Sequence, residues 1–70
     1  MMKYEWQLID KCIAHEIAYG EAETLEEAMK AADAAAIGFE GRYKLAAYSD
    51  DEEWFRFRHT AWQNLKDRVR

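Results

Sequence analysis

The tetrapeptide Thr24-Leu25-Glu26-Glu27 constrains the fold of this chain more than any other feature, because it marks the start of a helix. In this capping-box pattern the Thr24 hydroxyl accepts a hydrogen bond from the Glu27 N–H, and the Glu27 carboxylate reaches back to the Thr24 N–H. An apolar stripe follows and predicts a helix that ends near Gly38. The stripe consists of Leu25, Ala28, Met29, Ala32 and Ala36.

The segment before this helix supports two interpretations. Lys3–Leu8 alternates polar and apolar residues, which is the period of a half-buried strand, and Ile13–Tyr19 repeats the alternation. These runs predict a β-hairpin over residues 3–19, although its turn lacks an Asn-Gly or Asp-Gly pair. The alternative is a helix that ends at Gly20. Apolar residues at helical spacing support it, namely Met2, Trp6, Ile9, Ile13 and Ile17.

A second helix is predicted from Ser49 to the end of the chain. Ser49-Asp50-Asp51-Glu52 repeats the capping-box pattern, and neither Gly nor Pro interrupts the residues that follow. The apolar face of this helix is expected to consist of Trp54, Phe57, Ala61, Leu65 and Val69. Residues 42–48, between the two helices, fit either a third strand or a short helix.

These elements predict one domain over residues 1–70, of the α+β class, with an N-terminal β-hairpin packed with two α-helices. An all-α three-helix protein is the alternative. The expected core contains Trp6, Leu8, Ile17, Leu25, Met29, Trp54, Phe57, Ala61 and Leu65. A chain of 70 residues buries only a modest core, so we also expect self-association, in its simplest form a homodimer, to add stability.

The chain contains one cysteine, Cys12, so no internal disulfide can form and we expect a reducing, cytoplasmic environment. No stretch approaches the about 20 apolar residues that span a bilayer, and no membrane association is expected. Cys12 and His15 supply at most half of a zinc site, which needs four ligands in paired spacing. Neither residue belongs to a nucleophile motif with an oxyanion loop. We therefore expect a non-enzymatic protein without metal or cofactor.

Charge is sorted along the chain. Residues 1–53 hold 13 acids against 5 bases, whereas residues 54–70 hold 5 bases against 1 acid. Four consecutive carboxylates at the change of sign exceed what helix capping requires, and acids beside aromatic anchors are typical of a protein interface. The predicted partner-binding site consists of Asp50, Asp51, Glu52, Glu53, Phe55 and Arg56.

The segment Tyr19–Ala28, with the sequence YGEAETLEEA, resembles a strand-to-helix junction of small phage and prophage proteins. In those proteins a hairpin is followed by a Thr-capped, Ala-rich helix, and the resemblance extends over Trp6–Ala36. It implies an α+β domain from a mobile element, in the class that includes anti-CRISPR proteins and other inhibitors of host factors. Those families share no motif with this chain, so no functional residues carry over.

The predicted function is a small acidic protein-binding module that inhibits or regulates a host protein or nucleoprotein complex by occupying its basic surface. A structural homodimer within a larger assembly is one alternative. The other is a nucleic-acid-binding regulator, because cations alternate with rings near the end of the chain. Its cations would be Arg56, Arg58, His59, Lys66, Arg68 and Arg70. The net charge of −4 disfavours direct binding to nucleic acid.

Overall fold

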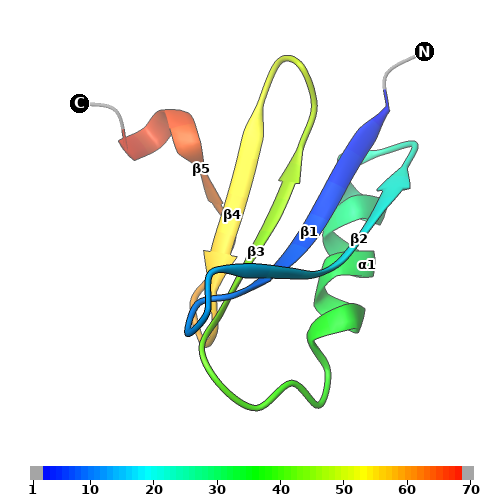
Figure 1. Cartoon of the computed structure of the whole chain (residues 1–70). Coiled ribbons are helices and arrows are strands. Elements are labelled where there is room, and N and C mark those ends of the chain that lie inside the picture. Colours follow the sequence, from blue (N-terminus) through cyan, green and yellow to red (C-terminus); the bar gives the residue numbers. More distant parts are fainter. Residues whose placement is uncertain (1–2, 69–70) are drawn as a thin grey trace.

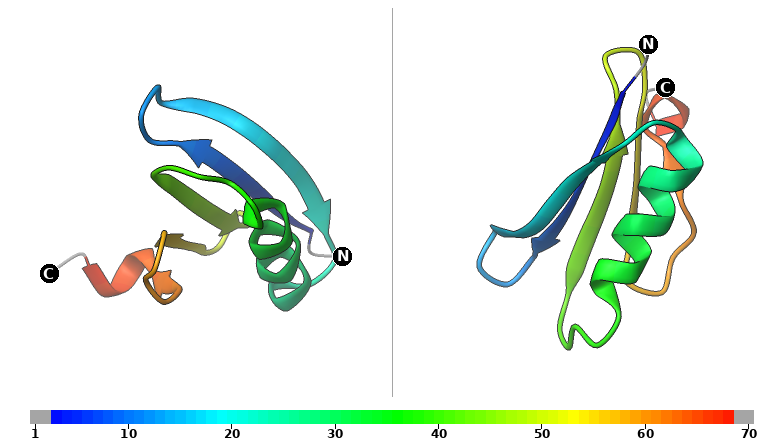
Figure 2. Two further views of the ribbon diagram at one scale, coloured as in Figure 1. Left: turned by 90° about the horizontal axis from the view of Figure 1, so that it is seen from below. Right: turned by 90° about the vertical axis from the view of Figure 1, so that its right-hand side faces the viewer.

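The computed structural model describes residues 3–68 and shows an antiparallel five-stranded sheet with one α-helix against one face (Figure 1). The elements in chain order are β1 (Tyr4–Asp10), β2 (His15–Ala22), α1 (Leu25–Ala36), β3 (Tyr43–Tyr48), β4 (Glu53–Phe57), β5 (Gln63–Asn64) and the 3₁₀ helix η1 (Leu65–Arg68). The strands lie in the order β2-β1-β3-β4-β5. Sheet and helix form two layers, as the views in Figure 2 show.

The predicted architecture of a hairpin with two helices is wrong, and so is its all-α alternative, because residues 3–68 form a five-stranded sheet with a single α-helix. Glu53–Phe57 is strand β4, which pairs antiparallel with β3, and Gln63–Asn64 pairs with β4. Among residues 49–68, the only helical turn within the predicted second helix is the short η1. Residues 69–70, at the end of that predicted helix, lie outside the described residues.

Hydrogen bonds around Ser49 give the physical reason for this difference. The Ser49 hydroxyl accepts a hydrogen bond from the Asp51 N–H at 3.3 Å, and the Ser49 N–H donates to the Glu52 carbonyl at 2.9 Å. A serine followed by acids can start a helix, but the same local hydrogen bonding also stabilises turns. Here it closes the turn between β3 and β4.

The N-terminal half forms the predicted elements. The alternating run at the start of the chain lies in β1, which pairs with β2 as a hairpin with a bulge between Leu8 and Ile9. Residues 43–48 are strand β3, one of the two possibilities left open for that segment.

Helix α1 begins where the capping box predicts. The Thr24 hydroxyl accepts a 3.1 Å hydrogen bond from the Glu27 N–H, and the helix ends at Ala36, close to Gly38. Gly38 has a φ of +84°, a left-handed conformation that glycine adopts without strain. Among residues 3–68, no helix combines the length and the apolar character needed to cross a membrane.

The core lies between α1 and the face of the sheet that it covers. Ala32 and Ala36 of the helix pack against Leu8 of β1 and Leu45 of β3, and both leucines are at most 2% exposed. A second group beside the first consists of Tyr4, Ala28 and Ala47. Because the helix presents alanines, its backbone lies close to the sheet.

The predicted core is partly correct. Leu8 is buried, and five other members are half-buried: Trp6, Leu25, Met29, Trp54 and Phe57. Three members are exposed instead: Ile17, Ala61 and Leu65. Ile17 lies on the edge strand β2, and the other two were placed in the core by the helix that does not form.

Gly20 makes room for the indole of Trp6, its partner across the β1–β2 pair; a Cβ there would lie 2.6 Å from Nε1 of Trp6. We expect Gly20→Ala to displace this ring and to lower the free energy of unfolding by about 1–3 kcal/mol. Glu21→Ala, at the adjacent exposed position, is the control and should change stability by no more than about 0.5 kcal/mol. Urea unfolding measures both variants, and equal midpoints would contradict this packing.

Candidate functional site

Two groups of charged side chains lie at opposite ends of strands β3 and β4. The β3–β4 connection lies at one end of the sheet. Because neighbouring strands are antiparallel, the connections β1–β2, α1–β3 and β4–β5 meet at the other end (Figure 1). We call residues 49–53 the acidic turn.

Glu52 fastens the acidic turn to the sheet. Its carboxylate accepts hydrogen bonds from the Trp54 indole N–H at 2.7 Å and from the Tyr4 hydroxyl at 2.8 Å. The indole and then the hydroxyl stabilise the charged carboxylate, so they lower the pKa of Glu52. The pKa of Tyr4 is raised, mainly because its hydroxyl donates to this carboxylate. One carboxylate of the predicted site is therefore held by internal hydrogen bonds.

The other three acids of the turn have no ion-pair partner among the described residues. Asp50 and Asp51 are exposed, and Glu53 is half-buried at the start of β4. Within the part of the chain that the structure describes, none of the three forms an ion pair. Leu65, which is 40% exposed, and Lys66 line the same shallow hollow as the turn. The surface thus combines negative charge with an exposed apolar side chain.

The two remaining residues of the predicted site do not lie on this surface. Phe55 is 2% exposed within β4. The Arg56 guanidinium donates a 3.0 Å hydrogen bond to the carboxylate of Asp33 on α1, and the Trp62 indole N–H donates to the same carboxylate at 3.3 Å. Arg56 therefore fastens β4 to the helix.

The cations of the predicted nucleic-acid site are separated in the structure. Arg56 is paired with Asp33, and Lys66 lines the hollow beside the acidic turn. Arg58 and the exposed His59 follow β4 at the other end of the sheet. The side chain of Arg68 and all of Arg70 lie outside the described part of the chain. Among the four cations whose side chains the structure describes, only the sequence neighbours Arg58 and His59 lie together.

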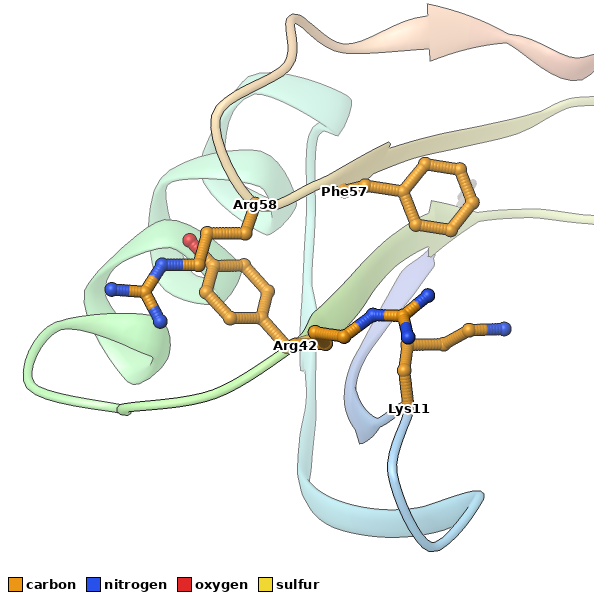
Figure 3. Close-up of a pocket in the computed structure, with 5 residues that line it drawn as sticks. Lys11, Arg42, Phe57 and Arg58 are labelled. Carbon is orange, nitrogen blue, oxygen red and sulfur yellow. The ribbon is translucent and has the colours of Figure 1, made fainter.

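A pocket of about 180 Å³ at that other end is a site that we did not predict from the sequence (Figure 3). We call it the basic pocket; it is lined by Lys11, Arg42, Tyr43, Phe57 and Arg58. Its three cations come from three different connections, β1–β2, α1–β3 and β4–β5, and no acidic side chain is among the lining residues. Two pairs in the sequence could have indicated this pocket, because each places a cation beside an aromatic ring at the end of a strand. They are Arg42-Tyr43 and Phe57-Arg58.

Backbone hydrogen bonds bring the three connections together. The Lys11 N–H donates to the Arg42 carbonyl at 3.0 Å, and the Arg58 N–H donates to the Tyr43 carbonyl at 3.3 Å. The Arg58 guanidinium also donates to the Gly41 carbonyl at 2.8 Å. The backbone that carries the three cations is therefore held by main-chain hydrogen bonds and by the side chain of Arg58.

The side chains of the basic pocket divide into two sets. The Lys11 ammonium lies 5.8 Å from the centre of the Phe57 ring, a cation–π distance. Figure 3 shows Arg42 extending toward the same side as Lys11, whereas Arg58 points away from them. Lys11, Arg42 and Phe57 thus form one cationic and aromatic corner.

Neither end resembles a metal or thiol centre. Cys12 is an exposed free cysteine in the β1–β2 turn, and His15 is exposed at the start of β2. Among the side chains that the structure describes, no three of His, Cys, Asp or Glu are grouped so that they could hold a metal ion.

Comparison of the chain with protein-family models, with curated proteins and with solved structures gives no match. The resemblance to phage and prophage proteins and the homodimer therefore stay predictions. Exposed apolar side chains do occur along the β1–β2 turn and β2, namely Ile13, Ile17 and Tyr19.

Protonation of Glu52 is expected to weaken the folded protein. Its pKa is lower in the folded protein than the ordinary value of 4.5, so charged Glu52 contributes stability above that value. This contribution is lost as the pH falls through the lower folded pKa. Glu52→Gln should therefore have a lower melting temperature than the wild type at about pH 7, and this difference in melting temperature should shrink toward about pH 3.

Thermal unfolding followed by circular dichroism across this pH range measures the effect. Glu53→Gln removes a neighbouring carboxylate without a hydrogen-bond partner among the described residues, and it serves as the control. A difference between Glu52→Gln and the wild type that stays constant with pH would contradict the role assigned to Glu52.

Proposed function

We propose that this protein is a non-enzymatic binding module that docks through its acidic turn onto a basic surface of a larger protein. The observation that supports the proposal is a fixed turn whose negative charge is not neutralised by other described residues. Glu52 holds the turn, while Asp50, Asp51 and Glu53 form no ion pair with other described residues. An ordered array of like charges steers a partner of opposite charge and loses little conformational entropy on binding.

The surroundings of the turn support a protein as the partner. Leu65 is exposed beside the acids, and Trp54 is half-buried next to Glu53. Protein interfaces typically combine a small apolar centre with a polar or charged rim. In this proposal Leu65 takes the part that the sequence assigned to Phe55, because Phe55 is buried. Arg56 is likewise left out, because it pairs with Asp33.

Occupying a basic surface would inhibit or regulate a host protein or nucleoprotein complex whose basic groove normally holds an anionic ligand. Carboxylates on a turn can compete for such a groove without any chemical reaction. The resemblance of Tyr19–Ala28 to mobile-element proteins favours an inhibitor. The single cysteine favours action in the cytoplasm.

Reversal of the two exposed aspartates tests this proposal. We expect Asp50→Lys/Asp51→Lys to reduce capture of the partner from host-cell lysate by about tenfold or more, because steering by charge contributes that much to association. The wild-type capture should itself weaken between about 50 mM and about 300 mM salt, since exposed charges are screened. Quantitative mass spectrometry of the captured proteins gives the measurement.

The matched control is Glu16→Lys/Glu40→Lys, which changes the net charge equally at two exposed positions outside the turn. It should capture the same proteins as the wild type. Equal loss with both double variants would show a general effect of charge, and no loss with Asp50→Lys/Asp51→Lys would refute docking through the turn.

A further inference from the structure

The basic pocket takes no part in the proposed docking, yet it concentrates positive charge in a protein whose net charge is −4. The two ion pairs among the described residues are Lys3–Glu21 and Arg56–Asp33. Neither involves a cation of the pocket. Like charges held near one another repel, and an anion bound between them relieves that repulsion.

The pocket is built by parts of the chain that are held in place. Arg58 donates to the carbonyl of Gly41, the residue directly before Arg42, and the Arg42 carbonyl accepts from the Lys11 N–H. These bonds fix the backbone on which Lys11 and Arg42 stand. Both side chains are exposed, so a ligand can reach them.

The side chains of the basic pocket determine which kind of ligand it can bind. A guanidinium offers a planar fork of donors that matches phosphate oxygens, and an ammonium adds a compact second charge. The half-buried Phe57 ring supplies an apolar wall beside the two cations. A phosphate joined to an organic group meets both features.

The size of the pocket limits what it can hold. Its volume of about 180 Å³ is below the about 300 Å³ at which sites for drug-sized ligands begin, so it accommodates one end of a ligand. A long polyanion would meet the acidic remainder of the molecule, whereas nucleic-acid-binding surfaces usually belong to basic domains. A small molecule fits this charge distribution better than a nucleic-acid strand.

We propose that the basic pocket binds the phosphate of a small phosphomonoester of the mononucleotide type. Arg42 and Lys11 contact the phosphate oxygens, and Phe57 contacts the organic group. Arg58 acts as a positioning residue, because its guanidinium holds Gly41 and so the backbone of Arg42.

Titrations followed by ¹H–¹⁵N NMR test this assignment on the full chain. Inorganic phosphate and adenosine monophosphate should shift the amide signals of Lys11, Arg42 and Arg58, with adenosine monophosphate binding more tightly because it also contacts Phe57. Adenosine, which lacks the phosphate, should leave these signals unshifted. The absence of any shift with adenosine monophosphate would overturn the proposal without recourse to a variant.

Variants then locate the contact. Lys11→Gln/Arg42→Gln should weaken binding of adenosine monophosphate by about tenfold or more, because two hydrogen bonds to a charged group are lost. Lys3→Gln/Lys30→Gln removes the same charge at exposed positions elsewhere and should bind as the wild type does. Arg42→Lys keeps the positive charge without the planar fork of donors. Its affinity for adenosine monophosphate should lie between those of the wild type and of Lys11→Gln/Arg42→Gln.

Two results would contradict the proposal even if adenosine monophosphate binds. If Lys3→Gln/Lys30→Gln weakens the binding of adenosine monophosphate as much as Lys11→Gln/Arg42→Gln does, the effect is one of net charge only. Tighter binding of a short single-stranded oligonucleotide without terminal phosphates, with a steep dependence on salt, would identify a nucleic-acid surface instead. The oligomeric state and the docking partner do not enter these measurements, so failure here leaves the function proposed for the acidic turn unaffected.

Discussion

The close contact between the alanine face of α1 and the centre of the sheet is the interaction on which the rest of the structure depends. Ala28 and Ala32 are fully buried, and their small side chains let Leu8 and Leu45 fill the space between the two layers. Burying each leucine contributes about 1.5–3 kcal/mol, a large part of the stability available to so short a chain. The contact places the helix over β1 and β3 and determines which face of the sheet is covered.

The pairing of β3 with β4 then separates the charges in space. Strand β3 has six residues, which at about 3.4 Å per residue places its ends roughly 17 Å apart. The acidic turn lies at one end and the basic pocket at the other. This separation exceeds the Debye length of about 8 Å at physiological salt, so the two ends act on their ligands independently. One small domain can therefore present two surfaces of opposite charge.

Local signals in the sequence favoured the observed elements in the first half of the chain, although the apolar spacing of residues 2–17 also fitted a helix. The alternation in β1 and the Thr24 cap act between near neighbours, and both predict the observed elements. The run Trp54–Phe57 fits two periods, because its aromatic residues suit a helical stripe as well as an alternating strand. Pairing with β3 decides between them, and that pairing is a long-range contact.

The difference between local and long-range signals also applies to the acidic turn and the basic pocket. Consecutive carboxylates mark the acidic turn in the sequence, but the anchoring of Glu52 depends on Tyr4, which lies 48 residues away. Burial of Phe55 and the pairing of Arg56 with Asp33 likewise follow from the sheet and its contact with α1. The basic pocket requires the register of three strands at once. Sequence patterns alone do not contain that register.

Backbone NOEs in solution test most directly whether β4 pairs with β3 and so holds the acidic turn and the basic pocket at opposite ends. The structure predicts cross-strand contacts between Ala46 and Phe55 and between Lys44 and Phe57. A continuous series of contacts between residues i and i+3 through Asp50–Lys66 would contradict it. Such a helix would place the acids at its first turn and remove Arg58 from the neighbourhood of Tyr43.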